Sequence, residues 1–254
     1  MKRINLLNGY FDPLTTAQTI DAAFCNLANG KRGWIATVNV AILMKMRSDP
    51  QLQKFADDAA LTVADGQPLV WLSRLLRRDL PERVAGVDLV HALCKRAALE
   101  GKKVYLLGST EANVSRLASS LRASYPALQV TWSDGYFGDE EAIERAKQIR
   151  ENRTDILLIG MGVPRQELFL QKHWEAVDVG VAVPVGGSFD VLCGVRARAP
   201  LWMQRTGMEW FFRLVQEPRR LLVRYSVTNV QFLWLAGKAL VTERRRVPEP
   251  PKNC

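Results

Sequence analysis

The residue best placed for chemistry is Asp65, which follows the apolar segment Leu61–Ala64 and precedes a Gly-x-Pro turn at residues 66–68. An aspartate held at the end of a strand and partly removed from water can act as a general base. Aspartate before glycine is also common in ordinary turns and helix caps, which need no catalytic role. The local sequence therefore leaves two interpretations of Asp65 open, a proton acceptor and a turn residue.

Other polar and glycine residues follow apolar segments in the same way. Thr37 and Asn39 lie two apart in a candidate strand, so both side chains would face one crevice. The alternative is that they are ordinary polar residues of a strand and a helix cap. Gly108-Ser109 and Gly160-x-Gly162 each precede a candidate helix, whose first N–H groups can bind phosphate. Both glycine pairs fit a nucleotide diphosphate, although a tight turn explains each pair taken singly. Gln166, just beyond the second pair, offers a donor and an acceptor suited to a sugar hydroxyl.

Metal, disulfide and dinucleotide chemistry are not indicated. His91 and His173 stand apart, no D-x-D occurs, and the four cysteines form no C-x-x-C. There is no Walker A motif, and residues 160–165 lack the third glycine of the dinucleotide fingerprint. We expect no metal and no cofactor, and free thiols in a reducing cytosol. A nicotinamide-dependent oxidoreductase is disfavoured for the same reason.

Apolar, β-branched segments alternate with amphipathic segments of helical length, which predicts an α/β protein with a mainly parallel sheet and flanking helices. The candidate strands are Trp34–Val40, Leu61–Ala64, Val104–Leu107, Val130–Trp132, Ile156–Ile159 and Val179–Val183. The candidate helices are Pro68–Arg77, Leu89–Glu100 stopped by Gly101, Asn113–Ser124 ending before Pro126, and Glu140–Glu151 capped by Asp139. Because the carboxyl ends of parallel strands meet at one edge, we expect their polar residues to line one crevice.

The charge is concentrated near the end of the chain. Residues 196–246 hold eleven basic and three acidic side chains, a net of +8 out of +9 for all 254 residues. We therefore divide the chain into a catalytic core, residues 1–195 with halves meeting near residue 101, and a basic, aromatic-rich helical appendage, residues 196–254. Such an appendage suits an anionic membrane or a nucleic acid.

Eight motifs in a fixed order carry a resemblance to a known family. They are Thr37-x-Asn39, Asp65-Gly66-x-Pro68, Arg83-Val84-Ala85-Gly86-Val87-Asp88, Gly135-Tyr136-Phe137, Gly160-x-Gly162-x-Pro164-x-Gln166-Glu167, Gly186-Gly187-Ser188-Phe189-Asp190, Arg198-Ala199-Pro200-x-Trp202 and Glu209-Trp210-x-x-Arg213-Leu214-x-x-Glu217-Pro218-x-Arg220. Together they resemble the WecG/TagA/CpsF glycosyltransferase family over roughly residues 5 to 225. One departure is Arg165, where the family commonly has lysine, and it keeps the charge.

The resemblance implies an inverting transferase with a Rossmann-like core. Such an enzyme moves N-acetylmannosamine, its uronic acid or glucose from a UDP-sugar to a polyprenyl-diphosphate-linked saccharide in bacterial surface polysaccharide synthesis. The matching catalytic positions are the base Asp65 with Thr37, Asn39, Arg83 and Gln166. The arginines that complete the site at the membrane match Arg213, Arg220 and Arg224. We expect the crevice loops to bind the nucleotide sugar through Gly108, Ser109, Tyr136, Phe137, Gly160, Gly162, Gly187 and Asp190.

The resemblance also places the protein on the inner face of the cytoplasmic membrane as a peripheral protein. Residues 221–241 are too polar for a span of about 20 apolar residues, so we expect an interfacial helix on anionic lipid. A nucleic-acid-binding protein with an α/β core is the alternative, disfavoured by a nearly neutral body without a binding motif. A third interpretation makes the distal arginines a solvated face. The sequence predicts no oligomeric state.

Overall fold

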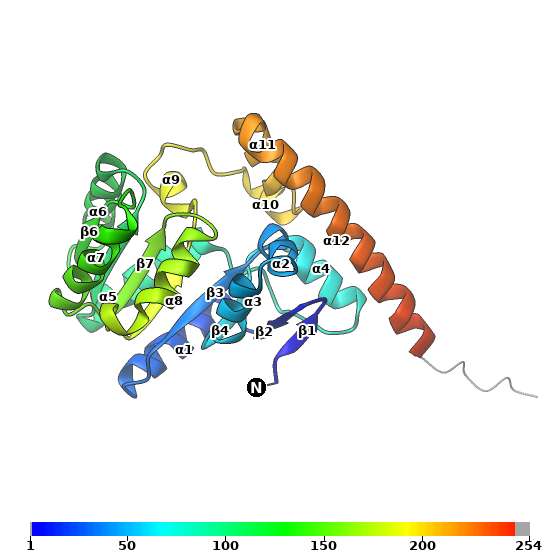
Figure 1. Ribbon diagram of the computed structural model, residues 1–254, viewed down its shortest axis with the longest axis horizontal. Coiled ribbons are helices and arrows are strands. Elements are labelled where there is room, and N and C mark those ends of the chain that lie inside the picture. The colour runs from blue at the N-terminus through cyan, green and yellow to red at the C-terminus, as the bar shows by residue number, and fades with distance from the viewer. Residues whose placement is uncertain (1, 247–254) are drawn as a thin grey trace, which may run out of the picture.

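The structure is a computed structural model that describes residues 2–246, apart from the side chains of residues 220, 223, 224 and 243–246. Its centre is a six-stranded sheet with the order β4-β3-β8-β7-β5-β6, in which every pairing is parallel. The strands are β3 (Gly33–Val38), β4 (Leu61–Ala64), β5 (Lys103–Gly108), β6 (Gln129–Ser133), β7 (Ile156–Gly160) and β8 (Val181–Pro184). The predicted α/β class and parallel sheet are confirmed (Figure 1).

Helices cover both faces of this sheet (Figure 1). They are α1 (Thr16–Ala28), α2 (Val40–Met46), α3 (Pro50–Asp57), α4 (Gln67–Leu75), α5 (Gly86–Glu100), α6 (Glu111–Ser124), α7 (Asp139–Glu151), α8 (Arg165–Val177) and α9 (Ser188–Leu192). Side chains alternate across each strand, so the adjacent residues Ile35 and Ala36 belong to two different cores. One core packs against α1, α5 and α6, and the other against α2, α3, α4, α7 and α8.

All six predicted strands are present, with shifted ends. The strand predicted for Trp34–Val40 ends at Val38, because Asn39 caps α2 and the chain turns into that helix. The strand predicted for Val179–Val183 runs from Val181 to Pro184.

The expected helix signals hold in most places. Gly101 ends α5 with a φ of 64°, a left-handed conformation that favours glycine, and Pro68 lies in the first turn of α4. The prediction of Asp139 as a helix cap is wrong, since Gly138 holds that position and Asp139 is the first helical residue.

Strands from both sides of residue 101 form one continuous sheet. Strand β8, which comes last in the chain, pairs with β3 on one side and with β7 on the other. An additional antiparallel hairpin of β1 (Ile4–Leu6) and β2 (Gly9–Phe11) lies outside this sheet. The division into a core of residues 1–195 and an appendage of residues 196–254 stays a prediction.

The basic end of the chain is helical, as predicted. It contains α10 (Leu201–Arg205), α11 (Glu209–Gln216) and the 29-residue α12 (Pro218–Arg246). Helix α12 packs against α2, buries Phe232 and Ala236, and then extends beyond the body of the molecule (Figure 1). Within residues 2–246, no helix combines the length and apolar character needed to cross a membrane.

Candidate active site

Asp65 lies at the carboxyl end of β4 and is half-buried. Its backbone N–H donates to the Val38 carbonyl (2.9 Å), and the N–H of Val84 donates to the Ala64 carbonyl (2.9 Å). The second bond brings the segment before α5 to the end of β4, where the Gly86 N–H hydrogen bonds to the Asp65 carboxylate. Asp65 is therefore held between a strand end and a helix start.

Burial raises the pKa of Asp65 from 3.8 to about 6. The positive charges of Arg83 and Arg213 oppose this rise, the negative charge of Glu209 adds to it, and the Gly86 hydrogen bond opposes it. A carboxylate with this pKa is largely ionised at pH 7 and is a stronger base than an ordinary aspartate. These are the properties of a general base that works near neutral pH.

An ion-pair network from two distant parts of the chain surrounds Asp65. Arg83 donates to Glu209 on α11, and Arg213, one turn further along α11, donates to the other oxygen of the same carboxylate (3.0 Å). The Arg83 and Glu209 side chains are only 13% and 16% exposed. Helix α11 is thereby docked at the carboxyl end of β4, so the structure brings Asp65, Arg83 and Arg213 together.

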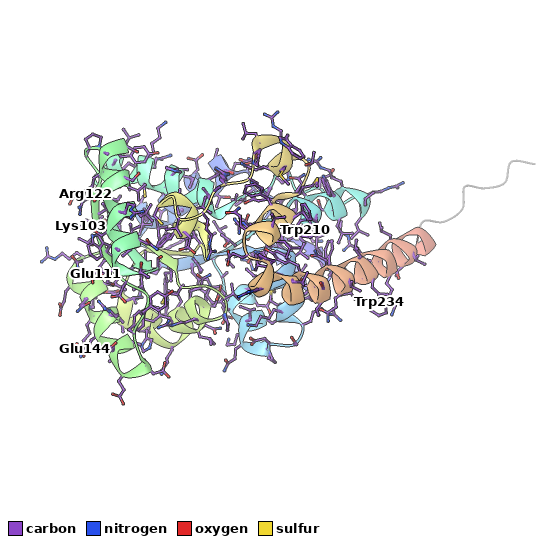
Figure 2. All side chains as sticks on the ribbon, turned by 90° about the horizontal axis from the view of Figure 1, so that it is seen from above. Lys103, Glu111, Arg122, Glu144, Trp210 and Trp234 are labelled. Atoms are coloured by element: carbon purple, nitrogen blue, oxygen red, sulfur yellow. The ribbon has the colours of Figure 1, made fainter. Side chains whose placement is uncertain are left out.

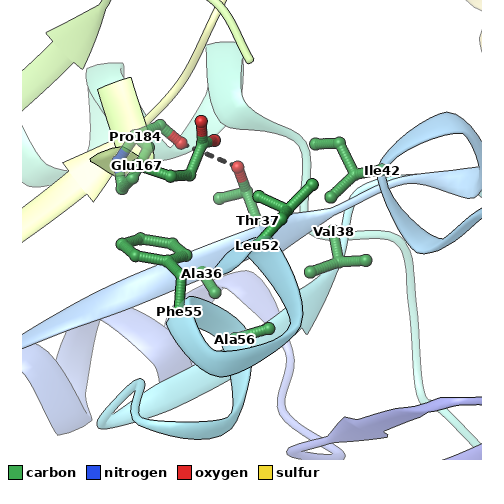
Figure 3. Close-up of a pocket in the computed structure, with 9 residues that line it drawn as sticks. All are labelled: Ala36, Thr37, Val38, Ile42, Leu52, Phe55, Ala56, Glu167 and Pro184. Atoms are coloured by element: carbon green, nitrogen blue, oxygen red, sulfur yellow. Dashed lines mark hydrogen bonds between the residues drawn. The ribbon is translucent and has the colours of Figure 1, made fainter. Parts of the chain in front are cut away.

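Thr37 uses its hydroxyl to join two neighbouring strands. The hydroxyl donates to the Pro184 carbonyl at the end of β8 (2.7 Å), and the Glu167 carboxylate points toward the same hydroxyl (Figure 3). These groups line a small pocket of about 10 Å³, close to the smallest volume that holds one water. The Thr37 hydroxyl proton is thus used in a hydrogen bond between two strands, while its oxygen can still accept a hydrogen bond.

Asn39 does not lie on a strand beside Thr37, contrary to the expectation from the sequence. It is the N-cap of α2, and its side-chain oxygen accepts from the Ile42 N–H (3.0 Å). The capping bond fixes the side chain next to Gly66. A β-carbon built on Gly66 would lie 3.8 Å from Asn39. Asn39 therefore still lies beside the turn that follows Asp65.

Gln166 is almost fully buried and connects two loops of the crevice. Its side-chain oxygen accepts from the N–H groups of Gly162 (3.2 Å) and Gly186 (3.1 Å), and its amide donates to Glu167 (2.8 Å). The carbonyl oxygen has no lone pair left for a sugar hydroxyl. In this geometry Gln166 positions the loops after β7 and β8.

The glycines at the ends of β5 and β7 allow these strand ends to approach each other closely. A β-carbon on Gly108 would lie 2.5 Å from the Gly160 carbonyl carbon, and one on Gly160 would lie 2.5 Å from the Phe189 ring. Beside them, the Ser109 hydroxyl donates to Asp190 (3.1 Å) in α9. Gly187, the residue before α9, completes a set of loops from β5, β7 and β8 that meet at one edge. Gly108 and Gly160 end their strands, Ser109, Gly162 and Gly187 follow in the loops, and Asp190 lies in α9, so all six residues lie at this edge.

Tyr136 and Phe137 lie in the loop before α7 but differ in their surroundings. The Tyr136 side chain is exposed. The Phe137 ring packs edge-on against Phe169 with centroids 5.8 Å apart, and the guanidinium groups of Arg145 and Arg165 lie over it at 5.8 and 5.0 Å. The structure therefore makes Phe137 a packing residue, whereas Tyr136 is available to a ligand.

Several arginines of the basic tail are paired rather than solvated. Arg196 contacts Asp190 (3.2 Å) and Glu217 (2.6 Å), and Arg198 contacts Asp88 (2.8 Å). These pairs tie the segment before α10 both to α9 and α5 and to the end of α11. These arginines at the start of the tail are therefore fixed in ion pairs, whereas the solvated-face interpretation concerns the distal arginines and stays open.

The other two predicted tail arginines, Arg220 and Arg224, lie in α12, and their side chains are outside the described part of the chain. Further along α12, the exposed Trp234 lies between the buried Phe232 and Ala236, with the Lys238 ammonium 4.1 Å from its ring centroid (Figure 2).

Glu209 is the site residue that the sequence analysis missed. Glu209 opens the last of the eight motifs, but its position there predicts no role. The only available signal was an acidic residue that is followed, four positions later on one helix face, by an arginine in a strongly basic segment. Its contact with Arg83, 126 positions away, has no local signature.

Comparison with known proteins gives a consistent result. The family model described as "Glycosyl transferase WecG/TagA/CpsF family" matches residues 4–246. The N-acetylglucosaminyldiphosphoundecaprenol N-acetyl-beta-D-mannosaminyltransferase of Bacillus subtilis (strain 168) is 33% identical over 220 residues, 86% of this chain and 84% of the relative. The protein of the same name from Bacillus spizizenii is 30% identical over 195 residues, 76% of this chain and 75% of the relative. This chain therefore belongs to the WecG/TagA/CpsF glycosyltransferase family.

Proposed function

We propose that this protein is an inverting glycosyltransferase that uses a UDP-sugar donor and a polyprenyl-diphosphate-linked saccharide acceptor. The observation that carries the proposal is the Asp65 carboxylate at a strand end, with a raised pKa and with two arginines beside it. The names of the two Bacillus relatives support an N-acetylglucosamine-bearing acceptor and N-acetylmannosamine as the sugar transferred. The uronic acid of N-acetylmannosamine and glucose are the other donor sugars to test.

In the proposed reaction Asp65 takes the proton of the acceptor hydroxyl as its oxygen bonds to the anomeric carbon of the donor. The bond from that carbon to the UDP oxygen breaks at the same time, and UDP leaves with the bonding electrons. A single displacement from the opposite face inverts the anomeric configuration and needs no covalent enzyme intermediate. One base and one stabilised leaving group are therefore sufficient.

The departing diphosphate requires positive charge. We infer that it is supplied by Arg83, by Arg213 and by the helix N-termini nearest Asp65, those of α4 and α5. Among the described residues, no three histidine, cysteine, aspartate or glutamate side chains gather where a metal could bind. We therefore propose leaving-group stabilisation by arginines and helix N–H groups, without a dedicated metal site.

A lipid-linked acceptor would be met at a membrane surface, and α12 supplies a suitable element. Its exposed side chains include Val230, Leu233 and Trp234, each 60% or more exposed, while Phe232 packs against the body. Apolar side chains on one side of a helix that also carries basic residues are typical of a helix lying in the interface. We propose that α12 places the active site on the inner, anionic face of the cytoplasmic membrane.

Incubation of the protein with a panel of UDP-hexoses and a soluble prenyl-diphosphate-N-acetylglucosamine analogue tests this function. Product mass identifies the sugar transferred, and the one-bond coupling between the anomeric carbon and its proton identifies the configuration. We expect one donor to give a disaccharide with inverted configuration. A product with retained configuration would contradict the single displacement, and no product with any donor would contradict the proposed substrates.

A further inference from the structure

Two arginines beside Asp65 present a physical difficulty for a general base. An aspartate with an opposite charge within about 4–6 Å normally has its pKa lowered by 1–3 units, which makes it a poor proton acceptor. Arg83 and Arg213 both act on Asp65 in this direction. Nevertheless, no described side chain forms an ion pair with Asp65, and both guanidinium groups pair with Glu209 instead.

We propose that Glu209 is a positioning residue that binds Arg83 and Arg213 beside Asp65 and balances their charge, leaving the Asp65 carboxylate able to take the acceptor proton. The proposal rests on the proposed function, because it gives a role to a group next to the proposed base. It goes beyond that function because Glu209 acts through the arginines and touches no reacting atom.

The geometry of Glu209 supports this role. Its side chain is 16% exposed, and its carboxylate uses one oxygen for Arg83 and the other for Arg213. Burial opposes its ionisation, but Arg213, Arg83 and Arg198 together outweigh burial and lower the pKa of Glu209. Glu209 is therefore negative throughout the pH range in which Asp65 titrates. The described charges facing Asp65 are thus two positive and one negative.

The position of Glu209 also links catalysis to the docking of the tail. Asp65 and Arg83 belong to the core, whereas Glu209 and Arg213 belong to α11. If α11 leaves the core, the Asp65 environment loses Glu209 and Arg213 together and keeps Arg83. The balance of charges around Asp65 therefore depends on the docking of α11.

Substitution of Glu209 with glutamine tests the proposal, because the amide keeps a hydrogen-bond acceptor for Arg83 and removes the charge. The pKa of Asp65 is measured directly by ¹³C NMR titration of aspartate-labelled protein, with the Asp65 carboxyl signal assigned by its absence in Asp65→Asn. We expect the pKa of Asp65 to fall by about one unit or more in Glu209→Gln. The acid limb of kcat/KM should move to lower pH by the same amount.

Glu217→Gln is the matched control. Glu217 is also a tail carboxylate that pairs with an arginine, Arg196, but it is not among the charges acting on Asp65. We expect the pKa of Asp65 to be unchanged in this variant. An equal fall in both variants would show an effect of tail docking rather than of the Glu209 charge, and would overturn the proposal.

Arg213→Gln gives a prediction of opposite sign and remains informative if Glu209→Gln does not fold. The substitution removes one of the two positive charges that lower the pKa of Asp65, so this pKa should rise. The double variant Glu209→Gln/Arg213→Gln should return it toward the wild-type value. An Asp65 pKa that is the same in wild type, Glu209→Gln and Arg213→Gln would overturn the proposal. Because the titration needs no substrate, a wild type that transfers no sugar would contradict the proposed function and leave this test intact.

Discussion

Replacing Asp65 with asparagine is expected to stabilise the folded protein at pH 8, because the ionised carboxylate is costly where it stands. The pKa of Asp65 is about 6 in the folded protein against an ordinary 3.8. Each pKa unit corresponds to about 1.4 kcal/mol, so the charged form reduces the free energy of unfolding by about 3 kcal/mol. Asparagine resembles the protonated side chain in shape and carries no charge, so the variant avoids this cost.

The pH dependence follows from the sign of the pKa change. Between about pH 4 and pH 6 the folded protein holds the Asp65 proton and the unfolded chain has released it. The contribution of Asp65 to stability is therefore lost as the pH rises through this window. The gain of the variant over wild type should be about 3 kcal/mol at pH 8, about half of that at pH 5, and close to zero below pH 4.

Thermal unfolding at pH 8 and pH 5 checks this prediction. For a protein of this size, about 3 kcal/mol corresponds to a rise in Tm of roughly 6 to 12 °C at pH 8. Asp88→Asn is the control, since it removes a more exposed carboxylate that pairs with Arg198 and should be neutral or slightly destabilising. A variant no more stable than wild type at pH 8, or equally stabilised at both pH values, would refute the account of Asp65 as a half-buried charge that destabilises the fold.

Three further predictions concern the metal, the membrane and the crevice. A chelator such as EDTA should leave initial transfer rates largely intact, whereas loss of activity that magnesium or manganese restores would disprove stabilisation by arginines and helix N–H groups. Leu233→Glu/Trp234→Glu should release the protein from anionic liposomes in a sedimentation assay, whereas Leu99→Glu, at a still more exposed apolar side chain on α5, should not. Continued sedimentation of the double variant would show that α12 is not the anchor. Gly160→Ala should lower the free energy of unfolding by about 1–3 kcal/mol in urea titrations, because its β-carbon would lie 2.5 Å from the Phe189 ring, and a neutral effect would mean that this strand end is not closely packed.

The strands were predictable because they carry a strong local pattern. A segment such as Ile156–Ile159 is apolar at every position, as expected for a strand covered by helices on both faces. The exact ends were less predictable. Val40 and the apolar residues after it continue the pattern beyond Val38, so the strand predicted from the sequence ran on into the first residue of α2. The N-cap preference of Asn39 was the signal that could have corrected this.

The crevice residues were predictable only in part, since their positions follow from the sheet topology but their contacts do not. Asp65 and Thr37 lie at neighbouring strand ends because β3 and β4 are adjacent and parallel. By contrast, the side-chain oxygen of Gln166 already accepts two hydrogen bonds and has no lone pair left for a ligand. The Phe137 ring packs against α8, although both side chains were expected to face a ligand. The pairing of Arg83 with Glu209 depends on where the tail docks, and no local pattern encodes that contact.

The most direct test of the central claim compares turnover and UDP binding in wild type and Asp65→Asn. Initial rates are measured with the preferred UDP-sugar and the soluble acceptor analogue at pH 8, and the Kd for UDP is measured by calorimetry. The account predicts a loss of at least about 100-fold in kcat, the usual scale for a general base, with an almost unchanged Kd. Nearly normal turnover in the folded variant would contradict the assignment of Asp65 as the base and, with it, the mechanism proposed for this site.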